Sequence, residues 1–283
     1  MDQAEIEAIE IELLLEALKR RYGYDFHNYA QASLKRRIER FMALAGYQRI
    51  AELIPAVMDS HELMQSLVNG FSVPVTEMFR DPHVFVTLRE QVIPLLKTYP
   101  FLNIWHAGCA TGEEVYSLAI LLHEEGLLDR CQIFATDFNQ ESLAKAQEGV
   151  FSLDRIRDFT LNYQAAQGKG SFSDYYHARY NRAKMVDHLK QNITFAPHNL
   201  VTDGVFIRVQ LILCRNVLIY FDKRLQNRVL GLFHDALERG GFLCLGRQES
   251  LRFTDVEEDF SCFTQKECIY RRVGGHTPSP KSP

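Results

Sequence analysis

Two hydrophobic patterns follow one another along the chain, and the change falls near residue 72. In the first part, apolar residues recur at spacings of three and four, which is the period of an amphipathic helix. Glycines are sparse there and runs of β-branched residues are absent, so residues 1–72 are predicted to form an all-helical domain. The first apolar stripe consists of Ile6, Ile9, Leu13 and Ala17, widened by Leu14 and Leu18.

From about residue 100 to residue 273, short apolar runs alternate with helical patterns. Such alternation predicts a mostly parallel sheet with helices on both faces. The expected strands are LNIWHAG, CQIFATD, NITFAPHNL, VQLILCRNV, GGFLCLG and, as the last, CFTQKECIYRRV. The expected helices are EEVYSLAILLHEE, NQESLAKAQEG and FDKRLQNRVLGLFHDALERGG.

Three segments fall outside this alternation. GFSVPVTEMFRDP contains a glycine and two prolines, so residues 73–99 are predicted to be a linker and the start of the second domain. Residues 151–190 combine many aromatics with short alternating stretches, which predicts a small antiparallel β-subdomain inserted between the second and third strands. Residues 274–283, which include TPSPKSP, are expected to form a disordered tail.

Composition and charge exclude several classes of protein. Of the 283 residues, 46% are hydrophobic and 24% charged, as in soluble globular proteins, and the net charge of −4 disfavours a general nucleic-acid binder. No apolar run approaches the roughly 18 residues of a membrane span, and the acidic N-terminus predicts an amphipathic helix rather than a signal peptide. The cysteines show neither CxxC nor zinc-ligand spacing, so we expect reduced, buried thiols in a cytoplasmic protein and no metal site. These cysteines are Cys109, Cys131, Cys214, Cys244, Cys262 and Cys268.

A glycine turn between the first predicted strand and its helix offers a ligand site. Gly108 and Gly112 form GxxxG, which is neither the dinucleotide fingerprint GxGxxG nor a phosphate-binding loop with its lysine. Glu113 follows at the helix N-terminus, where it would repel a pyrophosphate but attract a cationic or zwitterionic ligand. S-adenosylmethionine, which carries a sulfonium and an ammonium group, fits this pattern. The alternative is that acids are simply favourable in the first turn of a helix.

Polar residues also end the other predicted strands, and in open α/β sheets ligands bind at such ends. Asp137 ends the second strand, where an acid can hold ribose hydroxyls, although it could instead cap the following helix. Asn199 stands beside Leu200, where an adenine could be bound. The next strand end carries Arg215, Asn216 and Tyr220.

The motifs VTEMFRD, AGCATGEEVYSLAI, ATDFN, FAPHNL and CRNVLIYF occur in this order. Together they resemble the chemotaxis receptor methyltransferases of the CheR family, and the resemblance covers about residues 5–272. It implies an α/β fold: a class I S-adenosylmethionine-dependent methyltransferase sheet of Rossmann-like type, with an N-terminal all-helical domain and a small antiparallel β insertion.

The resemblance implies methyl transfer from S-adenosylmethionine to glutamate side chains of chemoreceptors. The products would be glutamate 5-O-methyl esters and S-adenosylhomocysteine. A glutamate, with a pKa of about 4.3, is already ionised at neutral pH, so the enzyme must align the reactants and exclude water rather than supply a base. This explains why no Ser/His/Asp or Cys/His constellation is needed, and Cys109 and Cys214 are expected to be packing residues.

Matching motifs also imply the site residues. Glu113 would meet the methionine amino group and Asp137 the ribose. Arg80 and Tyr220 would lie near the reactive methyl group and orient the incoming glutamate. The alternative for Arg80 is an ion pair with Asp81 or Glu77. The full set of implied cofactor contacts is Thr76, Arg80, Glu113, Asp137, Asn199, Leu200, Arg215 and Asn216.

The resemblance further implies that the helical domain meets the helical bundle of a chemoreceptor. Lysines and arginines cluster between residues 19 and 40, and on an acidic protein such a patch suits electrostatic docking to an acidic helical surface. The alternative is that these cations only form a solvated face. RNA binding is disfavoured because that helix lacks interleaved base-stacking motifs. The residues assigned to docking are Arg36, Arg37 and Arg40.

Several alternatives remain open at this point. The enzyme could methylate a small molecule or another protein, or the chain could be an S-adenosylmethionine-binding adaptor of a chemosensory pathway with little turnover. Some relatives bind a receptor's C-terminal pentapeptide on a glycine-rich turn of the insertion. HARYNRAKMV has no glycine at that place, so we expect no strong pentapeptide tether. A monomer is expected.

Overall fold

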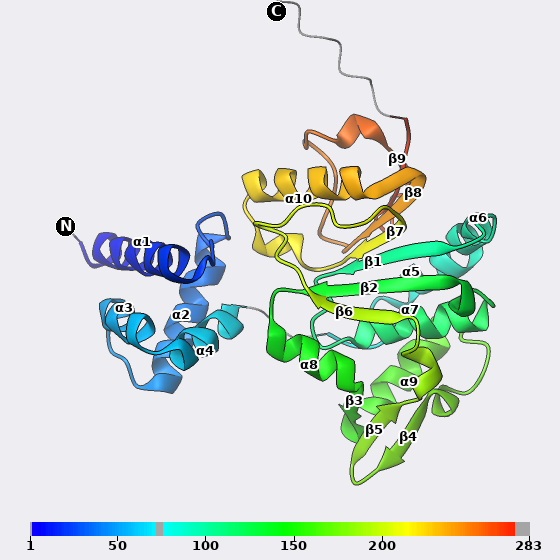
Figure 1. The fold of residues 1–283 in the computed structure, drawn as a ribbon, viewed down its shortest axis with the longest axis horizontal. Helices are drawn as coiled ribbons and strands as arrows, with labels where there is room; N and C mark the ends of the chain where they lie inside the picture. The colour runs from blue at the N-terminus through cyan, green and yellow to red at the C-terminus, as the bar shows by residue number, and fades with distance from the viewer. Residues whose placement is uncertain (1, 72–75, 275–283) are drawn as a thin grey trace, which may run out of the picture. The chain divides into compact units, whose positions relative to one another are not determined.

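The computed structural model describes residues 2–71 and 76–274 (Figure 1), and these divide into two compact units. The helical unit comprises residues 1–73 together with 219–228, and the sheet unit comprises residues 74–218 together with 229–283. The predicted boundary near residue 72 lies outside the described residues, as does the predicted tail 274–283 except for Gly274. Across the described ranges, every helix is too short or too polar to cross a membrane.

In the helical unit, described residues 2–71 form four helices, α1 (Gln3–Tyr22), α2 (Gln31–Ala45), α3 (Ile50–Asp59) and α4 (His61–Phe71). The start of α1 is fixed by a capping box in which the side chains of Asp2 and Glu5 each accept the other's backbone N–H. Both α1 and α2 end at a glycine in the left-handed conformation, Gly23 and Gly46, which a side chain would strain.

The buried face of α1 differs from the predicted apolar stripe. Ile9 is 45% and Leu13 is 54% exposed, whereas Leu14 and Leu18 are fully buried. The apolar residues of α1 occupy more than one face, and packing against α3 selects only one of them. The same face carries Glu10, which is buried because its carboxylate accepts from Arg49 at 2.6 Å.

The sheet unit is built on seven strands in the order β6-β2-β1-β7-β8-β10-β9. The first five are parallel to one another and β10 is antiparallel to both of its neighbours, β8 and β9, so the predicted mostly parallel sheet is confirmed. The strand order reverses between β1 and β7, which is the position where open α/β sheets bind ligands. Their bounds are β1 (Leu102–Ala107), β2 (Cys131–Asp137), β6 (Ile193–Pro197), β7 (Val209–Cys214), β8 (Leu237–Leu245), β9 (Phe260–Thr264) and β10 (Ile269–Arg272).

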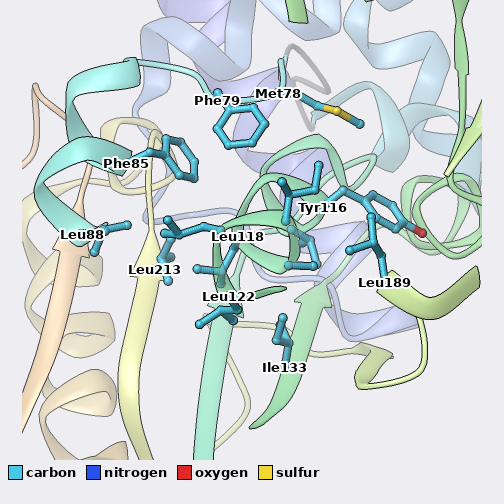
Figure 2. Packing of buried hydrophobic residues seen from close by; sticks show 14 of the residues in the cluster. Met78, Phe79, Phe85, Leu88, Tyr116, Leu118, Leu122, Ile133, Leu189 and Leu213 are labelled. Carbon is cyan, nitrogen blue, oxygen red and sulfur yellow. The ribbon is translucent and has the colours of Figure 1, made fainter. Parts of the chain in front are cut away.

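Helices cover both faces of this sheet, as predicted (Figure 1). On one face, α7 (Glu113–Glu124) packs into a continuous apolar core with the strands, and Figure 2 shows Leu118 and Leu122 of α7 with Ile133 and Leu213 of the sheet. On the other face, Phe233 of α10 (Lys223–Ala236) packs edge-on against Trp105. The helix α8 (Gln140–Glu148) follows β2.

Three elements differ from the prediction. The expected last strand is a hairpin of two strands, β9 and β10, because residues 265–268 form a turn. The strand β8 begins at Leu237, where the pattern predicted helix up to Gly241. The predicted linker is largely helical, since burial of its apolar residues overrides the signal of its prolines. It contains α5 (Pro82–Thr87), η1 (Leu88–Val92) and α6 (Ile93–Leu96).

The predicted insertion is a three-stranded antiparallel sheet in the order β3-β5-β4. It also holds the helix α9, which the sequence pattern did not reveal. The two-residue turn between β4 and β5 places Tyr180 and Asn181 at positive φ, the geometry of a tight hairpin without glycine. The elements are β3 (Val150–Ser152), η3 (Leu153–Arg155), α9 (Ile156–Ala165), η4 (Phe172–Tyr175), β4 (Tyr176–Arg179) and β5 (Arg182–Met185). The remaining short helices are η2 (Leu128–Arg130), η5 (Asp187–Leu189), η6 (Leu218–Tyr220) and η7 (Glu257–Asp259).

Candidate functional site

The glycine turn after β1 is hydrogen-bonded to the end of β2. The backbone N–H groups of Gly108 and Cys109 both donate to the carbonyl of Thr136, at 2.8 and 2.9 Å. The next N–H, that of Ala110, donates to Oδ2 of Asp137 at 2.9 Å. The turn therefore holds one of the predicted site residues directly at the carboxyl ends of two adjacent parallel strands.

Asp137 is a buried acid whose carboxylate organises this loop. Its Oδ1 accepts the N–H of Asn139 at 2.9 Å, and burial raises the pKa of Asp137 in spite of these hydrogen bonds. Asn139, not Asp137, caps α8, because its side chain accepts from Ser142 at 3.0 Å. Asp137 also accepts the backbone N–H of Phe138, and since a carboxylate has about four acceptor positions, one remains for a hydroxyl donor of a ligand.

Glu113 opens α7, and its side chain is 2% exposed. Oε2 accepts the hydroxyl of Thr111 at 2.6 Å, and Oε1 accepts Nη1 of Arg155 at 2.8 Å. Burial raises the pKa of Glu113, against the opposing effects of Thr111 and Arg155. Arg155 also donates to the carbonyl of Thr76, so this one guanidinium joins two predicted site residues. Sequence reasoning missed Arg155 because it lies in no motif.

Arg215 forms a buried ion-pair network rather than a surface contact. Its Nη1 lies 2.6 Å from Oε2 of Glu114, and its Nη2 lies 2.6 Å from Oδ2 of Asp81. It also donates to the carbonyl of Arg80 at 3.1 Å. Burial alone would raise the pKa of Glu114, but Arg215 and His106 outweigh it and lower that pKa. Asp81, one of the predicted ion-pair partners of Arg80, is thus bound by Arg215.

The segment that carries Thr76 and Arg80 is held by further contacts inside the sheet unit. The N–H of Phe79 donates to Oγ of Ser117 at 2.8 Å, and Asn162 of α9 donates to the carbonyl of Met78 at 3.0 Å. The ring of Phe79 is fully buried against aromatic rings, among them that of Phe85 (Figure 2). Thr76 and Arg80 are half-buried, so a ligand can contact their side chains while the surrounding contacts hold their backbone in place.

The predicted adenine-binding segment lies next to Asp137. The N–H of His198 donates to the backbone carbonyl of Asp137 at 3.1 Å, which follows from the pairing of β2 with β6. Oδ1 of Asn199 accepts the N–H of Val201 at 3.0 Å, which fixes its orientation. Leu200 is buried at 8% exposure.

Asn216 follows β7 in the left-handed conformation, with φ of 60°. Its N–H donates to Oε2 of Glu249 at 3.0 Å, and that same oxygen accepts the N–H of Gly246 at 2.6 Å. Glu249 therefore fixes the loop after β7. Oδ1 of Asn216 is buried and has no hydrogen-bond partner among the described residues, so a bound ligand could satisfy it.

Tyr220 belongs to the helical unit, whereas Arg80 belongs to the sheet unit, so their predicted proximity stays a prediction. The backbone carbonyl of Tyr220 accepts the N–H of Ala30 at 2.9 Å. The guanidinium of Arg37 lies 4.6 Å from the centre of the Tyr220 ring.

The predicted basic docking surface is smaller than the sequence indicated. Arg37 is buried at 8% exposure because it shares the inward face of α2 with Leu34 and Ile38. Arg36 and Arg40, one helical turn apart, are exposed. The other cations largely form ion pairs, namely Lys19 with Asp25, Arg20 with Glu16, and Lys35 with Glu7.

Five of the six cysteines are buried as predicted, and Cys262 on β9 is exposed. Burial raises the pKa of Cys109 and of Cys214 far above the usual value, which disfavours the thiolate and suits packing roles. Within the described ranges, no cluster of three or more His, Cys, Asp or Glu side chains could hold a metal ion.

Comparisons with known proteins identify two family models along the chain. Residues 9–72 match "CheR methyltransferase, all-alpha domain", and residues 74–269 match "CheR methyltransferase, SAM binding domain". The chain is 47% identical over 264 residues to "Putative methyltransferase Cher3" of Pseudomonas putida, covering 93% of this chain and 97% of that protein.

Two further relatives are each described as "Chemotaxis protein methyltransferase". The protein of Salmonella typhimurium is 32% identical over 229 residues, which cover 78% of this chain and 75% of that protein. The protein of Listeria innocua is 30% identical over 236 residues, which cover 83% of this chain and 87% of that protein. The similarity to these relatives thus spans both units.

Proposed function

The chain belongs to the CheR family of S-adenosylmethionine-dependent methyltransferases that act in chemotaxis, and on this premise we propose that its substrates are glutamate side chains of chemoreceptors. The proposed products are glutamate 5-O-methyl esters and S-adenosylhomocysteine.

The observation that carries the proposal is the pair of buried carboxylates, Glu113 and Asp137, at the carboxyl ends of β1 and β2. Glu113 suits the ammonium group of the cofactor, and Asp137 suits the ribose hydroxyls. Oδ1 of Asn216, which has no hydrogen-bond partner in the described part of the chain, adds an acceptor for a polar hydrogen of the ligand. These acids disfavour a pyrophosphate, so the donor set fits S-adenosylmethionine better than a dinucleotide.

When bound, the cofactor supplies a methyl group on a sulfonium. Glu113 and Asp137 would hold the cofactor, and a carboxylate oxygen of the substrate would take the methyl group, with the C–S bond breaking and its electron pair staying on sulfur. The substrate glutamate is ionised at neutral pH, so no protein base is required. The protein's part is to orient the carboxylate and exclude water, and we assign Arg80 and Tyr220 to that orientation.

The proposed partner surface is the exposed part of α2. Arg36 and Arg40 project from the helical unit without an ion pair among the described residues. Such a pair of cations suits an acidic helix in the cytoplasmic bundle of a chemoreceptor, since opposite charges steer association. We propose that the enzyme docks there as a monomer in the cytoplasm.

The test uses methyl-labelled S-adenosylmethionine, the purified protein and a purified cytoplasmic fragment of a chemoreceptor. Carboxyl methyl esters release methanol in alkali, whereas N-methyl and most O-methyl products do not. Alkali-volatile label that disappears when the receptor glutamates are replaced by alanine would support the proposal. Stable label would indicate another acceptor. No label on several receptors, with S-adenosylhomocysteine still bound, would instead favour the cofactor-binding adaptor.

A further inference from the structure

Arg155 links the inserted subdomain to the predicted amino-acid end of the cofactor site. It ends η3, directly before α9, and no motif of the family resemblance includes it. Its Nη1 lies 2.8 Å from Oε1 of Glu113, and its Nη2 donates to the carbonyl of Thr76. Both partners are residues assigned to the cofactor, so Arg155 lies between two cofactor contacts.

The guanidinium of Arg155 has donors to spare in a fixed position. An arginine carries five N–H donors, and the contacts to Glu113 and Thr76 use one from each terminal nitrogen. The group lies 4.8 Å from the centre of the Phe159 ring, which limits its motion. The side chain is 42% exposed, so the remaining donors are accessible to a ligand.

The charge and geometry of this group select a particular ligand group. In S-adenosylmethionine and S-adenosylhomocysteine, the ammonium and the carboxylate are attached to the same carbon atom. If Glu113 binds the ammonium, the carboxylate lies beside it, next to the guanidinium that already contacts Glu113. Arginine is well suited to a carboxylate because its paired N–H groups match the two oxygens.

We propose that Arg155 binds the carboxylate of the cofactor's amino-acid portion and so makes the inserted subdomain part of the cofactor site. This inference rests on the proposed function, specifically on Glu113 as the ammonium partner. It gives the insertion a role in cofactor selection in addition to any role in receptor binding.

The test measures binding of three ligands by calorimetry, without turnover. S-adenosylhomocysteine has both the ammonium and the carboxylate, its decarboxylated analogue keeps only the ammonium, and 5′-methylthioadenosine has neither. The key quantity is the ratio of the affinities for S-adenosylhomocysteine and the decarboxylated analogue. We expect that ratio to exceed about tenfold in the wild type and to fall close to one in Arg155→Gln.

Three variants separate a binding role from a structural one. Arg155→Lys keeps the charge and should retain an intermediate ratio. Arg157→Gln, the matched control, removes an exposed arginine two residues away and should keep the wild-type ratio. Glu113→Gln should weaken both amine-containing ligands but leave 5′-methylthioadenosine unaffected.

Partial unfolding would weaken the binding of all three ligands alike and would leave the ratio of the two affinities unchanged. An Arg155→Gln variant with the wild-type ratio would overturn the inference, because Arg155 would then only support Glu113. A wild-type protein that binds none of the three ligands would instead contradict the proposed function. Unchanged affinities in Glu113→Gln would contradict the assignment of Glu113 on which the inference rests.

Discussion

Arg215 and Glu114 form a buried ion pair, with Nη1 of the guanidinium 2.6 Å from Oε2 of the carboxylate. The pair joins the end of β7 to the first turn of α7, and the other terminal nitrogen of Arg215, Nη2, forms an ion pair with Asp81. One side chain therefore fixes three chain segments, including the segment that carries Arg80. Arg215 and its sequence neighbour Asn216 are both among the implied cofactor contacts, and in the structure the two terminal nitrogens of Arg215 contact Glu114, Asp81 and the carbonyl of Arg80.

Removing Arg215 should destabilise the protein strongly. Arg215→Ala removes the arginine that pairs with two buried or partly buried carboxylates, and breaking a buried pair typically costs about 3–5 kcal/mol in the free energy of unfolding. Urea denaturation measures this loss. The control is Arg208→Ala, which removes an exposed arginine and should change stability by less than about 0.5 kcal/mol. A loss below 1 kcal/mol for Arg215→Ala would contradict the role given to this network.

The assignment of Arg80 and Tyr220 predicts a separation of binding from turnover. In Arg80→Ala and in Tyr220→Phe, methylation of a receptor fragment should fall by well over tenfold, where each factor of ten corresponds to about 1.4 kcal/mol of transition-state stabilisation. Affinity for S-adenosylhomocysteine should change less, because orientation of the substrate is what is lost. If both variants retained full activity, the catalytic assignment would be wrong.

Position 108 requires a glycine for two reasons, the close packing around it and its left-handed backbone conformation. Its φ is +73°, and a Cβ atom added there would lie 2.5 Å from Cγ2 of Val217. Gly108→Ala should therefore destabilise the protein by about 2–4 kcal/mol, through overpacking and left-handed strain together. Gly126→Ala separates the two effects, because Gly126 has φ of +67° but nothing within 4 Å of the added atom. That control should lose only about 1 kcal/mol, and equal losses in the two variants would refute the steric argument.

The proposed docking surface predicts a salt-dependent effect. The double variant Arg36→Ser, Arg40→Ser should bind a receptor fragment at least about fivefold more weakly at low salt, with a smaller difference at high salt where charges are screened. Surface plasmon resonance at two ionic strengths measures this. Lys145→Ser with Lys266→Ser removes the same charge from exposed positions of the sheet unit and should leave binding unchanged. Equal weakening in both double variants would indicate a general effect of net charge.

The strands and the strand-end residues could be predicted because a short apolar run bounded by glycine and acids can form few structures other than a buried strand. The alternation of LNIWHAG and CQIFATD with helical patterns was sufficient to place Glu113 and Asp137 at one sheet edge. Such local patterns do not reveal which side chains meet across the fold. The contacts of Arg215 with Asp81 and of Arg155 with Glu113 connect distant segments, so no spacing in the sequence indicates them.

The errors in the prediction also have physical causes. The apolar residues of α1 lie on more than one face, and only contact with α3 decides that Leu14 rather than Leu13 is buried. Arg37 looked like part of a basic surface because charge alone does not tell which face of α2 is inward. In β8, residues 237–241 lie within a helix-like pattern, but Leu237 pairs with Val209 of β7 and the regular pairing resumes at Phe242, which is a tertiary effect.

The lowered pKa of Glu125 makes the free energy of unfolding depend on pH in acid. Its carboxylate, 8% exposed, lies 2.8 Å from Arg89, 3.1 Å from Lys97 and 2.7 Å from Lys169. Burial on its own raises the pKa of Glu125, but these three cations outweigh it and lower the pKa from 4.5 to about 2. A folded-state pKa below the unfolded value means that the folded state binds the proton less readily. The stabilisation is therefore complete above about pH 4.5 and is lost as the pH falls toward 2.

Urea unfolding of the wild type and of Glu125→Gln at a series of pH values measures this dependence. The variant should be less stable at pH 7, and the difference between the two proteins should shrink progressively below about pH 4.5, since Glu125 of the unfolded wild type binds a proton there while the folded state does so only near pH 2. Glu141→Gln, at an exposed ion pair with Lys145, is the matched control and should stay within about 0.5 kcal/mol of the wild type throughout. A difference that stayed constant from pH 7 to pH 3 would show that Glu125 stabilises the end of α7 by packing rather than by its charge.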